Sequence, residues 1–194
     1  QRIVFNGDGY SDEWVKEAAR RGLPNIKSMV EAASTLTTEK AVKLFEKFGI
    51  FTKVELESHE EIIYETYAKS INIEALTMID MAGKQIIPAV IRYTKVLADT
   101  VNAVKTAGAD ATTQDELLTI VGEKLAAMQT ALAKLKKAEK EASVMEDAKA
   151  QAFFYKDTVK AAMDELRAPA DELEMIVDKE YWPIPTYGEL MFEI

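Results

Sequence analysis

Most catalytic and metal sites are built from histidine, cysteine and paired carboxylates, and this sequence supplies few candidates. It has no cysteine and a single histidine, His59. A di-metal helical bundle requires Glu-x-x-His pairs, but the residue three positions before His59 is Leu56. Zinc sites with several histidines and Ser-His-Asp triads are also disfavoured. We expect His59 to be a surface residue, and we expect no catalytic residue, metal ligand or cofactor-binding residue in this chain.

The segment 6–12, Asn-Gly-Asp-Gly-Tyr-Ser-Asp, places oxygen-bearing side chains at alternate positions, as a calcium-binding loop does. Ser11 stands where that loop needs a glycine for its sharp turn. Gly7 and Gly9 before a helix start could attract an anion, but the lysine and the longer glycine pattern of a phosphate loop are missing. We favour a plainer interpretation, a turn followed by a helix that Ser11 caps.

Two other clusters also have plain interpretations. The lysines of segment 134–140 are interleaved with glutamates, which is typical of a solvated helix face. Met78, Met81, Met128 and Met145 could form an adaptable binding groove, but methionine at helical spacing is more often core filler, and we interpret them so.

The side chains that most suggest binding lie near the carboxy terminus. Two prolines exclude regular helix there, so residues 181–194 are predicted to form an extended tail. Aromatic side chains are enriched both in cores and at interfaces, so this tail either packs on the chain's own helices or docks on another domain or subunit. We favour the chain's own helices, because the tail follows the last helix directly. The candidate docking surface consists of Tyr181, Trp182, Pro183, Pro185 and Tyr187.

Charge and hydropathy exclude two classes of partner. The 33 acidic and 24 basic residues give a net charge of -9, which repels nucleic acid and anionic lipid. No window approaches the roughly 18 to 20 consecutive apolar residues of a membrane span, and the amino terminus lacks the basic-then-apolar order of a signal peptide. We therefore expect a cytoplasmic protein. Gln1 is not an initiator methionine, so we also expect the chain to be a piece of a larger protein.

The elements that position these residues are predicted to be helices only. Glycine (8) and proline (5) are scarce, and alanine, leucine, glutamate and lysine are plentiful, which indicates an all-α fold. Segment 1–50 is predicted to contain short connecting helices, the first capped by Ser11 and ended by Gly22. Ser28-x-x-Glu31 and Thr52-x-x-Glu55 are capping boxes that predict further helix starts.

Segment 51–180 is predicted to be a bundle in which one long helix packs antiparallel on a helical hairpin. The long helix, 57–107, should bend near Pro88, where the Lys84 carbonyl loses its donor. Thr113 should cap the next helix, and a turn near 141–146 should precede a last helix capped by Ser143, although continuous helix is an alternative. Pro169 should bend that last helix, and the prolines of the tail should end it. Steps of three and four residues predict a coiled-coil seam at Leu118, Val121, Leu125, Met128, Leu132 and Leu135.

Four stretches of this sequence are similar to a known family. The runs 6–14 and 21–25 resemble the segment that follows the catalytic domain of type III glutamine synthetases. Stretch 71–89, with its Ile-Asn-Ile-Glu-Ala run, resembles that family's central helix, and 182–187 resembles its ending. The resemblance spans essentially the whole chain in the right order.

The resemblance implies the carboxy-terminal accessory or oligomerisation domain of an enzyme that joins ammonia to glutamate. ATP and a divalent metal, magnesium or manganese, are implied for the whole enzyme, with none in this segment. The implied partners are the upstream catalytic domain and sister subunits of a dodecamer. The family's catalytic residues belong to upstream domains, so none is carried over to this chain. An independent coiled-coil adaptor that binds partner helices is the alternative.

Overall fold

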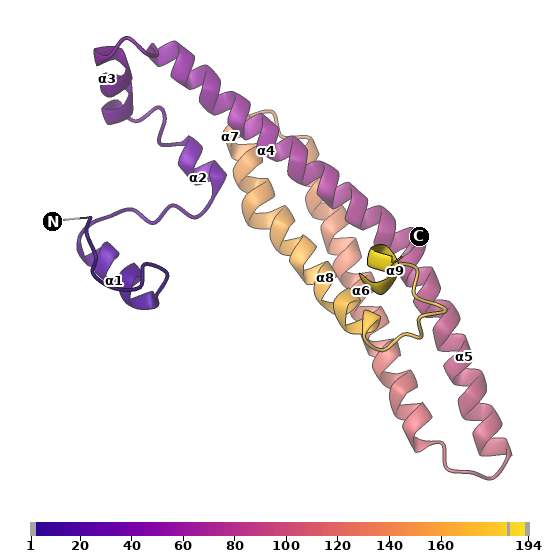
Figure 1. Ribbon diagram of the computed structural model, residues 1–194. Coiled ribbons are helices and arrows are strands. Elements are labelled where there is room, and N and C mark those ends of the chain that lie inside the picture. The colour runs from indigo at the N-terminus through magenta and orange to yellow at the C-terminus, as the bar shows by residue number, and fades with distance from the viewer. Residues whose placement is uncertain (1–2, 186, 193–194) are drawn as a thin grey trace. The chain divides into compact units, whose positions relative to one another are not determined.

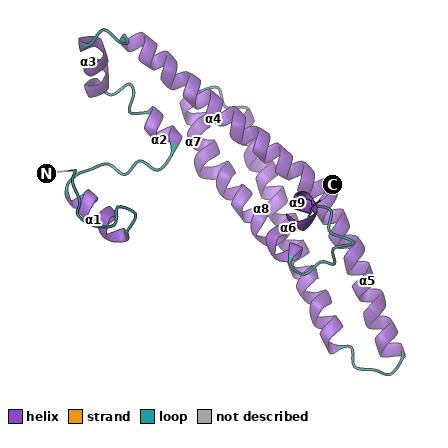
Figure 2. Ribbon diagram, in the orientation of Figure 1, coloured by secondary structure: helices purple, strands orange, loops and turns teal. Residues whose placement is uncertain are grey.

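The computed structural model describes residues 3–185 and 187–192, and it is drawn in Figure 1. Within these residues the regular structure is helical and no strand occurs, which confirms the all-α prediction (Figure 2). The chain divides into two compact units, Gln1–Tyr67 and Ala68–Ile194, which we call unit 1 and unit 2. No helix in the described part of the chain is long and apolar enough to cross a bilayer.

Unit 1 holds α1 (Asp12–Arg20), α2 (Met29–Ala33), α3 (Glu39–Lys47) and the first part of α4 (Lys53–Met81). The predicted caps are confirmed: the Ser11 hydroxyl accepts a hydrogen bond from the Trp14 amide, and the Ser28 hydroxyl accepts one from the Glu31 amide. These side chains satisfy amides that a helix start leaves without an intrahelical acceptor. Local sequence therefore fixes where these helices begin.

The end of α1 is fixed by Gly22, as predicted. Its φ of 67° lies in the left-handed region, where a side chain would clash with the backbone. The Gly22 amide donates to the Ala19 carbonyl and the Leu23 amide donates to the Ala18 carbonyl. This pair of bonds is the Schellman arrangement that ends many helices.

A buried polar contact joins α2 to α4 within unit 1. The Tyr64 hydroxyl donates to the Glu60 carboxylate at 2.6 Å and is hydrogen-bonded to the Ser34 hydroxyl, also at 2.6 Å. Glu60 is only 8% exposed, so its desolvation requires partners of this kind. Val30 and Ala33 of α2 are buried as well.

Unit 2 is a bundle built on α5 (Ile87–Thr106), α6 (Thr112–Ser143), α7 (Ala148–Phe154) and α8 (Lys160–Glu174). Helices α5 and α6 form an antiparallel hairpin, and α8 returns along α6 (Figure 1). The predicted seam residues Val121, Met128, Leu132 and Leu135 are buried, whereas Leu118 and Leu125 are half-buried. Four of the six predicted seam residues are therefore buried, and the two that are only half-buried lie in the first half of the seam.

The irregularity predicted at Pro88 takes the form of a π-helical turn. This turn, η1 (Ala82–Ile86), separates α4 from α5, and the Ile87 amide donates to the Ala82 carbonyl five residues earlier. Proline has no amide hydrogen to continue the α-helical pattern, and the wider turn accommodates that loss. A second π turn, η2 (Tyr155–Val159), joins α7 to α8.

Two predicted caps are wrong. Helix α6 begins at Thr112, and the Thr112 amide donates to the Asp110 carboxylate, so Thr113 lies inside the helix. The predicted turn near 141–146 exists, but Ser143 is the last residue of α6 and Asp147 caps α7. Asparagine, aspartate and serine cap about equally well, so the choice between such neighbours depends on how far the preceding helix remains packed.

The carboxy-terminal prediction is correct only in part. Helix α8 contains Pro169 and ends at Glu174, well before the prolines of the tail. Residues 187–192, predicted to be extended, form the short helix α9 (Tyr187–Phe192). A proline restricts itself and the residue before it, so Pro185 leaves the residues after it free to adopt helical geometry.

Candidate docking site at the carboxy-terminal strap

Residues 175–185 connect α8 to α9 along the bundle of unit 2, and we call them the strap. Asp178 organises the turn at the middle of the strap. Its carboxylate accepts a hydrogen bond from the Glu180 amide at 2.8 Å. Its carbonyl accepts bonds from the amides of Tyr181 and Trp182. Such a turn fixes the direction in which the two aromatic side chains leave the backbone.

Tyr181 packs on α5. Its ring centroid lies 5.7 Å from that of Tyr93, with the rings tilted by 48°. Tyr93 is buried, and this burial, followed by the negative charge of Asp178, raises the pKa of the Tyr93 hydroxyl above its ordinary value. Aromatic pairs at this separation contribute about 0.5 to 1.5 kcal/mol beyond their buried area. Tyr181 therefore anchors the strap to the bundle.

Trp182 and Ile184 of the strap line a groove of about 270 Å³ on unit 2. The floor comes from the end of α4, from η1, α6 and α8, and it is mostly apolar. Three methionines, Met78, Met81 and Met128, contribute to it. The core-filler interpretation fits the buried Met128, whereas Met78 and Met81 are half-buried. The remaining lining residues are Ala82, Ile86, Leu166, Arg167, Ala170, Asp171 and Glu174.

The indole nitrogen of Trp182 is buried and has no hydrogen-bond acceptor within the described structure. A buried donor without a partner costs about 1 to 3 kcal/mol. Apolar contacts therefore stabilise the half-buried indole ring, and the N–H group without an acceptor reduces that stabilisation. Of the other predicted surface residues, Pro183 is half-buried, Pro185 is exposed, and the side chain of Tyr187 lies outside the described part of the chain.

The strap residues Tyr181 and Trp182 were predicted from the sequence. The residues of the bundle that meet them were not. Tyr93 and Met78 both lie in the predicted long helix, 57–107, but that prediction does not say which residues of the helix meet the tail. That information depends on contacts between residues far apart in the sequence.

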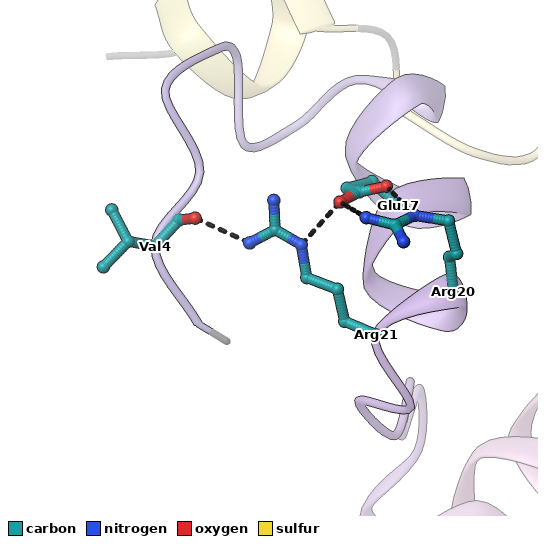
Figure 3. A network of polar contacts seen from close by, with 4 residues as sticks. All are labelled: Val4, Glu17, Arg20 and Arg21. Carbon is teal, nitrogen blue, oxygen red and sulfur yellow. Dashed lines mark hydrogen bonds and ion pairs between the residues drawn. The ribbon is translucent and has the colours of Figure 1, made fainter. Parts of the chain in front are cut away.

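A second polar cluster lies in unit 1, around Glu17 (Figure 3). The Arg20 guanidinium donates to both Glu17 carboxylate oxygens at 2.6 Å, and Arg21 donates to Glu17 and to the Val4 carbonyl, also at 2.6 Å. The hydrogen bonds from Arg20 and then Arg21 lower the pKa of Glu17 from its ordinary 4.5 to about 2. Arg21 also lies over the Trp14 ring, which packs on Phe5. The cluster fastens residues 4–5 to α1.

The oxygens of the calcium-like segment serve the turn before α1. The Asp8 carboxylate accepts the Tyr10 amide at 2.9 Å, and the Asp8 carbonyl accepts the Ser11 hydroxyl at 2.7 Å. His59 is exposed, and its ring lies 5.1 Å from that of Phe51. Among the described residues no group of three or more histidine, aspartate or glutamate side chains is placed to hold a metal ion.

Comparison with known proteins identifies the family. Residues 1–105 match the family model described as the glutamine synthetase C-terminal domain. This match covers more than half of the chain.

The chain belongs to the glutamine synthetase C-terminal domain family. It is 40% identical to a glutamine synthetase of Butyrivibrio fibrisolvens over 196 residues, which is 100% of this chain and 28% of that protein. It is 36% identical to the type-3 glutamine synthetase of Dictyostelium discoideum, over 98% of this chain and 27% of that protein. A glutamine synthetase of Bacteroides fragilis (strain YCH46) is 33% identical, again over 98% and 27%. This member of the family therefore spans little more than a quarter of the curated relatives it matches.

Proposed function

We propose that this chain is the carboxy-terminal accessory domain of a glutamine synthetase, which helps to assemble the enzyme's subunits and performs no catalysis by itself. One observation carries the proposal: nearly the whole chain aligns with three glutamine synthetases, yet it accounts for only 27 to 28% of each. A packed helical bundle with an aromatic strap is suited to holding protein surfaces together.

In this proposal the whole enzyme joins ammonia to glutamate with ATP and a divalent metal, magnesium or manganese. The described residues do not fit as the holder of the metal, and the sequence lacks the lysine and the longer glycine pattern of a phosphate loop. The described residues include no cluster of three metal-ligating side chains, and the turn before α1 uses its oxygens for capping. We therefore assign ATP and metal to the remainder of the enzyme and no chemical step to this domain.

An independent adaptor that binds partner helices has less support. Such an adaptor would present its coiled-coil seam to a partner. The seam residues Val121, Met128, Leu132 and Leu135 are instead buried within unit 2, so they are not available to another helix.

The test compares the full-length enzyme with a truncated form that lacks this domain. We expect the full-length enzyme to form a large assembly, of the size of a dodecamer, and to make glutamine. The truncated form should give smaller species by light scattering or native mass spectrometry, and the isolated domain should make no glutamine. A truncated enzyme of unchanged mass and activity, or glutamine formation by the isolated domain, would contradict the proposal.

A further inference from the structure

Unit 1 buries little of its own apolar surface. Its buried hydrophobic side chains in the described residues are Val30, Ala33, Val42, Leu56 and Tyr64. Its exposed large hydrophobic side chains are more numerous and include Met29, Leu44, Phe48, Ile50, Val54 and Ile62. Exposed apolar area costs roughly 25 cal/mol per Å², and a contiguous patch of it marks an interaction surface.

Four of these exposed residues belong to the stretch 44–54, in which α3 ends and α4 begins, and Figure 1 shows the bend of the chain between these two helices. Leu44 and Phe48 are four residues apart at the end of α3, Ile50 lies in the turn, and Val54 lies in the first turn of α4. We call these four residues the apolar corner.

The backbone of the apolar corner is fixed on both sides. Gly49 has a φ of 63°, its amide donates to the Glu46 carbonyl, and the Ile50 amide donates to the Phe45 carbonyl. These bonds form a Schellman motif at the end of α3. On the other side the Thr52 amide donates to the Glu55 carboxylate at 2.7 Å, and the Glu55 amide donates to the Thr52 hydroxyl. This capping box starts α4.

Aromatic contacts hold the inner side of the bend. The Phe51 ring lies 5.7 Å from Phe45 and 5.1 Å from His59. The outward side chains of the apolar corner are thus carried on a backbone that needs little further ordering when it binds. A surface that is already ordered loses less conformational entropy on binding than a mobile loop does.

Two lysines beside the apolar corner have carboxylate partners. Lys43 pairs with Glu39 at 2.5 Å, and Lys53 pairs with Glu57 at 3.4 Å. The Lys47 ammonium lies over the Phe48 ring, 5.5 Å from its centroid. A partner for such a surface is recognised by apolar contact, with polar groups at the rim.

We propose that the apolar corner is the surface on which the catalytic part of the same polypeptide docks. This inference rests on the proposed function. The chain covers little more than a quarter of relatives that are full glutamine synthetases, and the matching model is that of their C-terminal domain. The rest of such an enzyme would join this domain at unit 1. A tethered partner acts at high effective concentration, so modest apolar contacts suffice to keep it docked.

Thiol labelling of the full-length enzyme tests the docking. This domain has no cysteine, so Ile50→Cys introduces a single thiol into it. Ile91→Cys on α5 is a matched control, because Ile50 is 57% exposed and Ile91 is 55% exposed in the domain. Each rate of maleimide labelling is divided by the rate for the same variant in denaturant. We expect Ile50→Cys to be protected roughly tenfold or more relative to Ile91→Cys, because thiol reactivity follows exposure. Equal reactivity would overturn the proposal.

Photo-crosslinking identifies the partner. A benzophenone amino acid in place of Phe48 in the full-length enzyme should crosslink to a peptide of the catalytic part. Crosslinks to residues 68–194, or to this domain of another subunit, would overturn the proposal. Glutamine formation by the same preparation tests the proposed function separately: an active enzyme with a reactive Ile50→Cys contradicts the docking alone. A protected Ile50→Cys in an enzyme that makes no glutamine contradicts the assigned activity alone.

Discussion

Individual polar side chains in this domain act through hydrogen bonds whose strength depends on their charge. Glu17 is the clearest case, because two guanidinium groups bind one carboxylate. Its pKa in the folded domain, about 2, is below its ordinary value of 4.5. A group with a lowered folded pKa stabilises the folded state fully above its unfolded pKa. The contribution is lost as the pH falls toward the folded pKa.

We therefore expect the contact between residues 4–5 and α1 to weaken between about pH 4.5 and pH 2. Trp14 reports this contact, because its ring packs on Phe5 with centroids 4.8 Å apart. In a Trp182→Phe background, which leaves Trp14 as the only tryptophan, Trp14 emission should shift to the red over this range. Glu17→Gln should remove most of the pH dependence, and Glu13→Gln on the same helix should retain it. A Glu17→Gln variant with an unchanged acid transition would show that another group is responsible.

The indole nitrogen of Trp182 gives a second prediction for a single residue. Because this donor has no acceptor, Trp182→Phe should change the free energy of unfolding by less than about 1 kcal/mol. Trp182→Ala should cost about 2 kcal/mol, less than the ~3 to 5 kcal/mol of a fully buried aromatic side chain, because the ring is half-buried. Urea unfolding of the domain measures both values. Equal costs for the two substitutions would mean that the indole N–H has a partner after all.

Helix α6 contributes the predicted seam to the core of unit 2, and the seam residues are not equally buried. Leu132→Ala should destabilise the domain by about 3 kcal/mol, since Leu132 is almost fully buried. Leu125→Ala should cost about 1 kcal/mol, since Leu125 is half-buried and its removal leaves no closed cavity. Thermal or urea unfolding of the two variants shows which substitution destabilises the domain more. The reverse order would place the tight part of the seam toward the start of α6.

Three helix starts were predicted correctly from a signal that lies within one turn, whereas the same kind of signal failed at Thr113 and Ser143. Ser11, Ser28 and Thr52 cap helices because their side chains need only reach amides two or three residues ahead. Prediction failed at Ser143 because Asp147 is an equally good cap nearby. Packing decides between them: Ala138 and Ala142 are buried, so α6 continues past the point where its apolar pattern weakens.

The candidate site was predictable only on the side where its residues are neighbours in sequence. Tyr181 and Trp182 are conspicuous because two prolines follow them. The groove that Trp182 lines depends on which faces of four separate elements meet, and the π turn at η1 changes the face that α5 presents. The spacing of apolar residues within one helix does not show which faces of different helices pack together.

At the scale of the whole domain, deletion of the strap tests whether its contacts stabilise the bundle. Deleting residues 181–194 uncovers Tyr93 and the apolar groove, so the melting temperature of the domain should fall by roughly 2 to 4 °C for each kcal/mol lost. Deleting residues 187–194 is the control. It removes the exposed Leu190, Met191 and Phe192 but keeps Tyr181 and Trp182, so it should have little effect. Equal losses from the two deletions would assign the stabilising contacts to α9.

The π turn at η1 also has an evolutionary consequence. A π turn contains one residue more than the α-helical turn it replaces, so it is equivalent to a single-codon insertion in a continuous helix. Each residue added to a helix rotates everything after it by roughly 100°. Buried Tyr93, Leu97 and Val101 therefore face the core only because that extra residue is present. A one-residue deletion within 82–86 would turn these side chains toward solvent, so we expect gaps to be excluded from this segment among relatives, while substitutions at its exposed positions, Lys84 and Gln85, are accepted.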